Sequence, residues 1–172
     1  MNRLFNFCPN CGVESINPVS EKEITCTNCS FHLFINVAAA AGIFLHYDTK
    51  ILFLKRGRDP AKGQLDIPGG FVDPGENAEE AIRREVTEEI GIYLPEVHYF
   101  GSYANRYYFD EINYHTCDIY YECELSNPDS IRPRTEEVES CSFYEVCDIP
   151  FEQIGFPCLK QATLDFIEYH RL

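Results

Sequence analysis

Residues Gly70–Ile92 read GFVDPGENAEEAIRREVTEEIGI, and this stretch decides the fold because it predicts a loop followed by a helix with both ends marked. Asn77 is a favoured N-cap residue, and Glu80 three positions later completes a capping-box pattern. Gly91 suits the left-handed residue that ends many helices. Upstream, residues 63–75 are rich in Gly, Pro and Asp and predict a structured loop. We therefore expect a loop and then one helix over residues 77–90.

Three carboxylates fall on one face of this predicted helix. Glu85, Glu88 and Glu89 stand at i, i+3 and i+4, a spacing that brings side chains together. They repel one another and lie near the negative end of the helix dipole, so the arrangement is unfavourable unless a cation binds there. Carboxylates are the hard oxygen ligands that Mg²⁺ and Mn²⁺ prefer. The alternative is an acidic, solvated helix face on an acidic protein.

The surrounding residues extend this pattern to nine defined positions, spaced as G-x5-E-x7-R-E-U-x-E-E-x-G-U, where U is apolar. They are Gly70, Glu76, Arg84, Glu85, Val86, Glu88, Glu89, Gly91 and Ile92. The segment resembles the Nudix box and matches it at every defined position. Together with the preceding Pro68 and Gly69 and the order of predicted strands, the resemblance extends over about residues 36–172.

This resemblance implies an α+β fold, an α/β/α sandwich with a mixed β-sheet, and a loop–helix segment that binds one to three Mg²⁺ or Mn²⁺ ions. Carried over by position, Glu88 and Glu89 are metal ligands, the carbonyl of Gly69 is a further ligand, and Glu85 is a ligand or the base that activates water. The positions that the resemblance marks as structural are Gly70, Glu76, Arg84 and Gly91.

In many members of the family a glutamate from a late loop also acts as ligand or base. The polar segment Ser126–Glu139 predicts a long loop and offers Glu136, Glu137 and Glu139 as candidates. We favour Glu137, with the alternative that all three are ordinary loop charges.

The first thirty-five residues predict a separate metal-binding module. Cys8 and Cys11 form one CxxC pair and Cys26 and Cys29 a second, and two such turns can close a site of four thiolates. One structural Zn²⁺ suits this site best, although iron takes the same ligands. The stretch resembles a zinc ribbon. Its second turn carries Ser30 where glycine is usual, so we expect that turn to be looser. The predicted domains are residues 1–35 and 36–172.

The remaining elements follow from apolar periodicity. A hairpin is expected from the two apolar runs 37–45 and 51–55, with further strands over 93–108, 116–125 and 140–145 and a closing amphipathic helix over 159–170. Cys117 and Cys123 lie in a strand-like run and are interpreted as small buried apolar residues.

Charge and composition limit the partners. The formal net charge of −14 argues against nucleic acid as a partner, and an anionic substrate needs local cations. Lys55, Arg56, Arg58 and Lys62 form one basic cluster, from which Arg56 and Arg58 are candidate substrate-binding residues; the alternative is a solvated loop. The chain shows neither a signal-peptide pattern nor an apolar run long enough to span a membrane, which predicts a cytoplasmic protein. The sequence allows a homodimer.

The substrate is less well marked. A zinc ribbon before a Nudix domain resembles the NADH pyrophosphatase branch, but that branch carries an SQPWPFP-type segment where this chain reads FGSYANRYYFDE over residues 100–111. The proline typical of ADP-ribose enzymes is also absent, whereas Tyr107 and Tyr108 fit a tyrosine typical of dinucleoside-polyphosphate enzymes. Tyr103, Tyr107 and Tyr108 are candidates to stack on a base, with Arg106 as a phosphate partner; strand aromatics that simply belong to the core are the alternative.

The resemblance therefore predicts a metal-dependent pyrophosphohydrolase that cleaves a small-molecule nucleoside diphosphate linked to another group, of the ADP-ribose or NADH type. Two alternatives stay open. One is a dinucleoside polyphosphate hydrolase, and the other is a non-catalytic sensor or nucleic-acid-binding module, which retention of every box carboxylate disfavours.

Overall fold

The computed structural model describes residues 6–14, 16–20, 22–110, 112–128 and 131–172. The chain separates into two compact units, Met1–Val37 and Ala38–Leu172, and each is described by itself. The first unit contains the two CxxC pairs and the second the capped helix.

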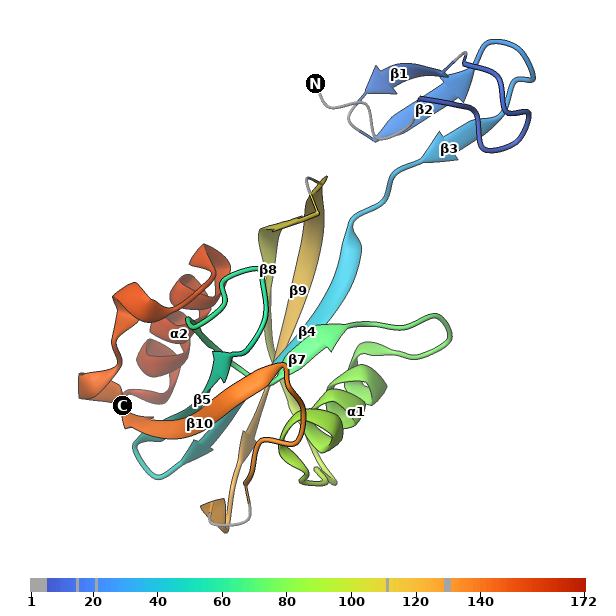
Figure 1. The fold of residues 1–172 in the computed structure, drawn as a ribbon. Coiled ribbons are helices and arrows are strands. Elements are labelled where there is room, and N and C mark those ends of the chain that lie inside the picture. Colours follow the sequence, from blue (N-terminus) through green and yellow to red (C-terminus); the bar gives the residue numbers. More distant parts are fainter. Residues whose placement is uncertain (1–5, 15, 21, 111, 129–130) are drawn as a thin grey trace. The chain divides into compact units, whose positions relative to one another are not determined.

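The N-terminal unit is a small three-stranded antiparallel sheet in the order β1–β2–β3 (Figure 1). Its strands are β1 (Ile16–Ser20), β2 (Glu23–Cys26) and β3 (His32–Phe34). Among its residues whose burial is described, the buried apolar side chains are Cys8, Ile24 and Cys26. The part of the unit whose burial is described therefore has almost no hydrophobic core, and two of these three buried residues are candidate metal ligands.

The second unit is built on a mixed sheet whose main path runs β10–β5–β4–β9–β8. The strands are β4 (Ala38–Tyr47), β5 (Lys50–Arg56), β8 (His98–Phe109), β9 (Ile112–Glu124) and β10 (Val138–Glu145). The short strands β6 (Leu65–Asp66) and β7 (Gly69–Phe71) pair with β5 and β4. The β4–β9 pair is parallel and the other pairs are antiparallel, so the predicted mixed sheet is confirmed.

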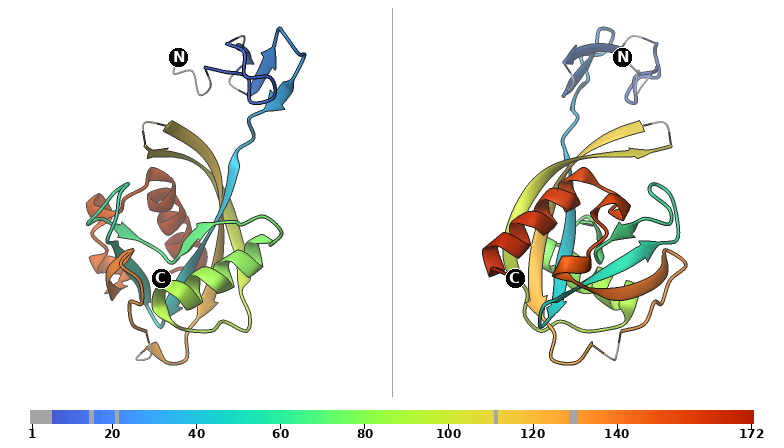
Figure 2. Two further views of the ribbon diagram at one scale, coloured as in Figure 1. Left: turned by 45° about the vertical axis from the view of Figure 1, so that its right-hand side comes forward. Right: turned by 90° about the vertical axis from the view of Figure 1, so that its left-hand side faces the viewer.

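One helix covers each face of this sheet, and Figure 2 shows the sheet between them. Helix α1 (Ala78–Ile90) packs its buried Ile82 and Val86 into one apolar cluster. Helix α2 (Pro157–His170) packs Leu159 and Phe166 into a second, where Phe166 stacks on Phe44 of β4 at a centroid distance of 4.6 Å. Two short 3₁₀ helices, η2 (Val146–Asp148) and η3 (Phe151–Gln153), lead into α2. The predicted α/β/α sandwich is confirmed.

Several boundaries differ from the sequence prediction. The expected hairpin of β4 and β5 forms, but β8 begins at His98 rather than at Tyr93, whose aromatic side chain is exposed outside any strand. The prediction that Cys117 and Cys123 are buried is wrong, because both are only partly covered. The loop predicted over residues 126–139 ends earlier, at the start of β10.

Candidate functional site

The four cysteines of the N-terminal unit converge on one point. The Sγ atoms of Cys8 and Cys29 lie 3.7 Å apart, and so do those of Cys11 and Cys26. All four sulfurs lie within 4.8 Å of one another. Sulfurs at the Zn–S distance of a tetrahedral site, about 2.3 Å, are separated by about 3.8 Å. The spacing of these thiols therefore fits a tetrahedral ion with four sulfur ligands.

The two CxxC turns have the same backbone geometry. The N–H of Gly12 donates to the carbonyl of Cys8 at 2.9 Å, and the N–H of Ser30 donates to the carbonyl of Cys26 at 3.1 Å. Gly12 and Ser30 both take left-handed backbone angles, with φ of 71° and 58°. The expectation of a looser second turn is wrong, because the serine adopts this conformation at a cost of about 1–2 kcal/mol and closes the same hydrogen bond.

Each turn also supports a sulfur of the other. The side-chain amide of Asn10 donates to Cys29 Sγ at 3.5 Å, and that of Asn28 donates to Cys11 Sγ at 3.6 Å. The Asn10 amide lowers the pKa of Cys29, and the Val13 N–H, followed by the Asn28 amide, lowers the pKa of Cys11 to about 6. These donors favour thiolates, the form that binds metal.

The loop and α1 of the second unit form the predicted capped structure. The side chain of Asn77 accepts from the N–H of Glu80, and the Glu80 carboxylate accepts in return from the N–H of Asn77, both at 2.9 Å. Gly91 ends the helix with φ of 74°. The two caps set the length of the helix and therefore determine which carboxylates lie in its last two turns.

Arg84 ties this helix to the preceding loop. It donates from Nη2 and Nε to the carboxylate of Glu76 at 2.6 and 3.2 Å, and from Nη2 to the carbonyl of Phe71 at 3.1 Å. The same hydrogen bonding lowers the pKa of Glu76. The Nη1 atom of Arg84 donates to the carboxylate of Glu85 at 2.7 Å. One guanidinium therefore holds both the loop and the first of the three clustered carboxylates.

The three carboxylates on the helix face differ in burial. Glu89 is 9% exposed and accepts from the Gly69 N–H at 3.0 Å, and burial raises its pKa to about 8. Burial also raises the pKa of Glu85, against the opposing effect of Arg84. Glu88 is the most exposed and lies 3.4 Å from Arg84 Nη1. A cation would stabilise the charged forms of the buried Glu89 and the partly buried Glu85, which suits a metal site on this face.

These carboxylates do not close into a tight cage as the cysteines do. Within the described residues, the four cysteines are the one group of three or more His, Cys, Asp or Glu whose ligand atoms all lie within 4.8 Å of one another. Arg84 holds Glu85, and the Gly69 N–H holds Glu89. Each carboxylate keeps further acceptor positions beside this hydrogen bond, so an ion can bind on this face without displacing the partner. The donor set, carboxylates beside a backbone carbonyl, remains the one that Mg²⁺ or Mn²⁺ takes.

Two adjacent glycines allow the loop to pass this close to its neighbours. A Cβ on Gly70 would lie 2.2 Å from Glu85 Oε1, and a Cβ on Gly69 would lie 2.2 Å from the carbonyl oxygen of Ala41. At Gly69 the neighbour is backbone, so only a residue without a side chain fits, whereas at Gly70 the end of the Glu85 side chain would have to move.

Among the three late-loop glutamates, Glu137 is the one that reaches the cavity beside the helix. Its side chain pairs with Arg58, and its carbonyl accepts from the Gly57 N–H at 2.7 Å. Glu139 instead pairs with Lys55 at 2.7 Å on the surface.

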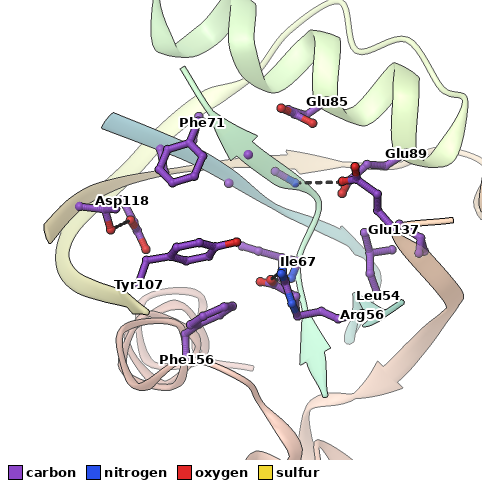
Figure 3. A pocket seen from close by; sticks show the side chains of 18 of the residues that line it. Leu54, Arg56, Ile67, Phe71, Glu85, Glu89, Tyr107, Asp118, Glu137 and Phe156 are labelled. Carbon is purple, nitrogen blue, oxygen red and sulfur yellow. Dashed lines mark hydrogen bonds and ion pairs between the residues drawn. The ribbon is translucent and has the colours of Figure 1, made fainter. Parts of the chain in front are cut away.

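A cavity of about 350 Å³ lies between this acidic face and β8, β9 and the start of α2 (Figure 3). Acidic side chains of α1 and the late loop line one side, and aromatic and polar side chains line the other. The aromatic ones are Phe71, Tyr107, Tyr120 and Phe156, and the polar ones include Arg56, Asp66, Asn105, Thr116 and Asp118, whereas Arg58 pairs with Glu137 of the acidic side. The volume lies in the range of small-molecule sites.

The structure brings only some of the candidate substrate residues to this cavity. Arg56 and Arg58 line it. Tyr103 does not, because its hydroxyl donates to Asp165 of α2 at 2.7 Å. Arg106 and Tyr108 are exposed and do not line it, since alternate residues of a strand face opposite ways. Of the aromatic cluster expected on β8, Tyr107 alone faces the cavity.

Sequence reasoning missed the acidic and aromatic residues at the far end. Asp66 pairs with Arg56 at 2.6 Å, and burial raises the pKa of the Asp66 carboxyl. Asp118 is buried in the middle of β9, and Phe156 precedes α2. A carboxylate within a predicted strand was the available signal for Asp118.

Comparison with known proteins supplies a family. A family model described as "NUDIX domain" matches residues 36–162. An ADP-ribose pyrophosphatase of Methanocaldococcus jannaschii is 43% identical over 67 residues, 39% of this chain and 39% of that protein. The NAD-capped RNA hydrolase NudC of Deinococcus radiodurans is 28% identical over 174 residues, 99% of this chain and 59% of that protein. The chain thus spans less than two thirds of the length of either relative.

Solved structures agree with this fold. A NUDIX hydrolase of Nitrosomonas europaea superposes with a TM-score of 0.74 at 22% identity, over 97% of this chain and 93% of that one. The NUDIX domain of Shewanella oneidensis NrtR, solved with ADP ribose, gives a TM-score of 0.65 at 17% identity, over 79% of this chain and 90% of that one. Helices long and apolar enough to cross a membrane are not found in the described part of the chain.

Proposed function

The chain belongs to the NUDIX family, and from that premise we propose that it is a metal-dependent pyrophosphohydrolase. Its substrate is a nucleoside diphosphate linked to another group, of the ADP-ribose or NADH type, and the bond it cleaves is the phosphoanhydride. The relatives named for ADP-ribose and for an NAD cap support this substrate class.

The observation that carries the proposal is the placement of the complete box. Glu85, Glu88 and Glu89 line one wall of a cavity whose other wall carries Tyr107 and Phe156. A nucleotide with its diphosphate at the acidic wall would meet these rings with its base. One cavity thus offers both a place for metal-bound phosphate and a place for a heterocycle.

In this proposal one to three Mg²⁺ or Mn²⁺ ions are held by Glu85, Glu88, Glu89 and the carbonyl of Gly69. Bound ions neutralise the charge of the diphosphate and lower the pKa of a coordinated water. Gly70 and Gly91 keep the ligand-bearing segment in place, and Arg84 with Glu76 orients it.

The chain's own side chains supply the proton transfer and the positioning. Glu85 and Glu137 are the two candidates for the base that takes a proton from the attacking water. Arg58 pairs with Glu137 at the cavity, so an incoming phosphate would compete for this guanidinium. Arg56 is already held by Asp66 and by the carbonyl of Pro60, which suits a fixed cation in the cavity wall.

The N-terminal unit is proposed to bind one structural Zn²⁺ through Cys8, Cys11, Cys26 and Cys29. Four thiolates fill a tetrahedral site and leave no position for substrate. This ion would stabilise the unit and take no part in hydrolysis.

Two alternatives are tested with the main proposal. Tyr107 faces the cavity, which also fits a dinucleoside polyphosphate hydrolase. A non-catalytic module is disfavoured because no box carboxylate is replaced. We keep a small-molecule substrate and a cytoplasmic location as predictions, and the net charge of −14 argues against nucleic acid as a partner. A homodimer remains compatible with the proposal.

The test is a substrate panel with Mg²⁺ and with Mn²⁺, followed by chromatography and phosphorus NMR of the products. It should contain ADP-ribose, NADH, a diadenosine polyphosphate, ATP and NAD-capped RNA. We expect AMP together with a second monophosphate from ADP-ribose or NADH, with the glycosidic bonds intact. Release of free nicotinamide, or no metal-dependent turnover of any member, would contradict the proposal.

A further inference from the structure

A buried carboxylate faces the cavity at the end away from the proposed metal ligands. Asp118 of β9 is 8% exposed and lines the cavity. Figure 3 places it on the opposite side of Tyr107 from Glu89 and Glu137. It is therefore separate from the carboxylates of the box.

Three neutral groups of the described chain donate hydrogen bonds to this carboxylate. Asn105 Nδ2 and Cys158 Sγ donate to its Oδ2 at 2.9 and 3.3 Å, and Thr116 Oγ1 donates to its Oδ1 at 2.6 Å. Within the described ranges no Lys, Arg or His forms an ion pair with Asp118; Arg56 pairs with Asp66. A carboxylate has about four acceptor positions. With three donors bound, Asp118 retains one position for a donor that enters the cavity.

Asn105 adds a donor beside this acceptor. Its Oδ1 accepts from the N–H of Arg106 at 2.7 Å, which fixes the orientation of the amide. One amide hydrogen is used on Asp118, so the second remains for a ligand. An acceptor and a donor side by side complement an amino group next to a ring nitrogen, the edge that adenine presents.

Aromatic rings flank this polar pair. Tyr107 lies nearly parallel to Phe156, at 22° and a centroid distance of 6.0 Å, and meets Phe71 edge-on at 5.5 Å. Rings of this kind bind planar heterocycles through their faces.

We propose that Asp118 is a specificity-determining residue, which accepts a hydrogen bond from the exocyclic amino group of an adenine-type base held against these rings. The inference rests on the proposed function, because it assigns the base of that substrate to the far end of the same cavity. Asn105 donates to a ring nitrogen of the same base. A base without an amino group would leave the buried carboxylate facing an acceptor or nothing.

The test is equilibrium binding of two nucleoside monophosphates by isothermal titration calorimetry without divalent metal. AMP should bind about tenfold to a hundredfold more tightly than purine riboside 5′-monophosphate, which has hydrogen in place of the amino group, because a hydrogen bond to a charged group is lost. Equal affinities, or no AMP binding at millimolar concentration, would overturn the inference.

Asp118→Asn separates recognition from a structural role. The variant should reduce the affinity ratio to less than about threefold, since the amide also presents a donor to the ligand. The control Asp165→Asn, which changes a carboxylate bonded to Tyr103 outside the cavity, should keep the full ratio. Loss of both affinities in equal proportion would overturn the inference. Because binding needs no turnover, selective AMP binding by a protein that hydrolyses nothing would contradict the proposed function alone.

Discussion

The two units of this chain reach a fixed structure by different means. In the N-terminal unit, the described buried apolar residues are Cys8, Ile24 and Cys26, and the sulfurs of four cysteines meet at one point. In the NUDIX domain, two apolar clusters fill the space on either side of the sheet. We therefore expect the first unit to depend on a metal bound by these cysteines, whereas the second is stabilised by burial of its own apolar side chains.

Because of this difference, we expect removal of a metal ion to change the stability of the two units by different amounts. Removing a metal from a unit with so small a core removes most of its folding free energy. Removing metal from the proposed box site would take a ligand from a domain that folds through its own core. The comparison therefore predicts that structure and catalysis respond to separate ions.

The largest expected effect is loss of the N-terminal unit on removal of zinc. Structural Zn²⁺ contributes on the order of 10 kcal/mol or more to such units, so a strong chelator should unfold it while the domain stays folded. Two-dimensional NMR of the whole chain would show collapse of the signals of residues 6–37 only.

Cys8→Ser should have the same effect as the chelator, and Cys147→Ser, at an exposed cysteine of the domain, should have none. Purified protein without zinc or iron by elemental analysis, yet with a folded N-terminal unit, would contradict this account.

The second prediction concerns a substitution in the core of the NUDIX domain, which should leave the N-terminal unit unchanged. Phe166 is fully buried and contacts Phe44 and Phe100, so Phe166→Ala should lower the free energy of unfolding of the domain by about 3–5 kcal/mol. Denaturant unfolding would measure it, with Leu164→Ala on the exposed side of α2 as the control. Zinc content should not change. A shift of the N-terminal unit by a similar amount would show that the two units are not independent.

The sequence predicted the local features because local interactions produce them. The capping box of Asn77 and Glu80, the ending at Gly91 and the paired CxxC turns each involve residues a few positions apart. The mixed sheet followed from the family resemblance.

What the sequence could not supply was the direction of side chains fixed by distant contacts. Tyr103 and Tyr107 share a face of β8, but Asp165 of α2 takes the first away from the cavity. Asp118 gains its place from β8 and α2 partners far along the chain. The turn at Ser30 was predicted wrongly for another reason. The prediction relied on the preference of glycine for left-handed backbone angles, but the hydrogen bond that closes the turn compensates the cost of placing a serine there.

A smaller effect is expected from a change that moves one carboxylate without disturbing either unit. A Cβ on Gly70 would meet Glu85, so Gly70→Ala should displace that carboxylate and lower kcat by about tenfold to a hundredfold. Thermal unfolding should change little, because only a side-chain end has to move. In steady-state assays the double variant with Glu85→Gln should be no slower than Glu85→Gln alone, since both changes act on one group. If the losses in kcat from the two substitutions were additive, Gly70→Ala would act through a group other than Glu85.

The smallest expected effect is a pH dependence confined to the domain. Burial, and then the nearby His170, lower the pKa of His46, while Glu124 and Glu122 oppose the shift. The unfolded chain therefore binds a proton more readily, and the free energy of unfolding should fall as pH falls below about 6.5, the value for an unperturbed histidine. Denaturant unfolding between pH 8 and pH 5 would detect this, and His46→Gln should reduce the slope. An unchanged slope would assign the dependence to other groups.

The central claim, that the helix face holds the catalytic metals, is tested most directly by turnover of the hydrolysed substrate across a Mg²⁺ titration. Glu85→Gln, Glu88→Gln and Glu89→Gln should each lower kcat by about 10²–10⁴ or demand more metal, because each removes a ligand or the base. Glu79→Gln, on the exposed first turn of the same helix, is the matched control and should retain near-native turnover. Near-native turnover of Glu85→Gln and Glu89→Gln at every Mg²⁺ concentration would contradict the account and leave the three carboxylates as an acidic surface.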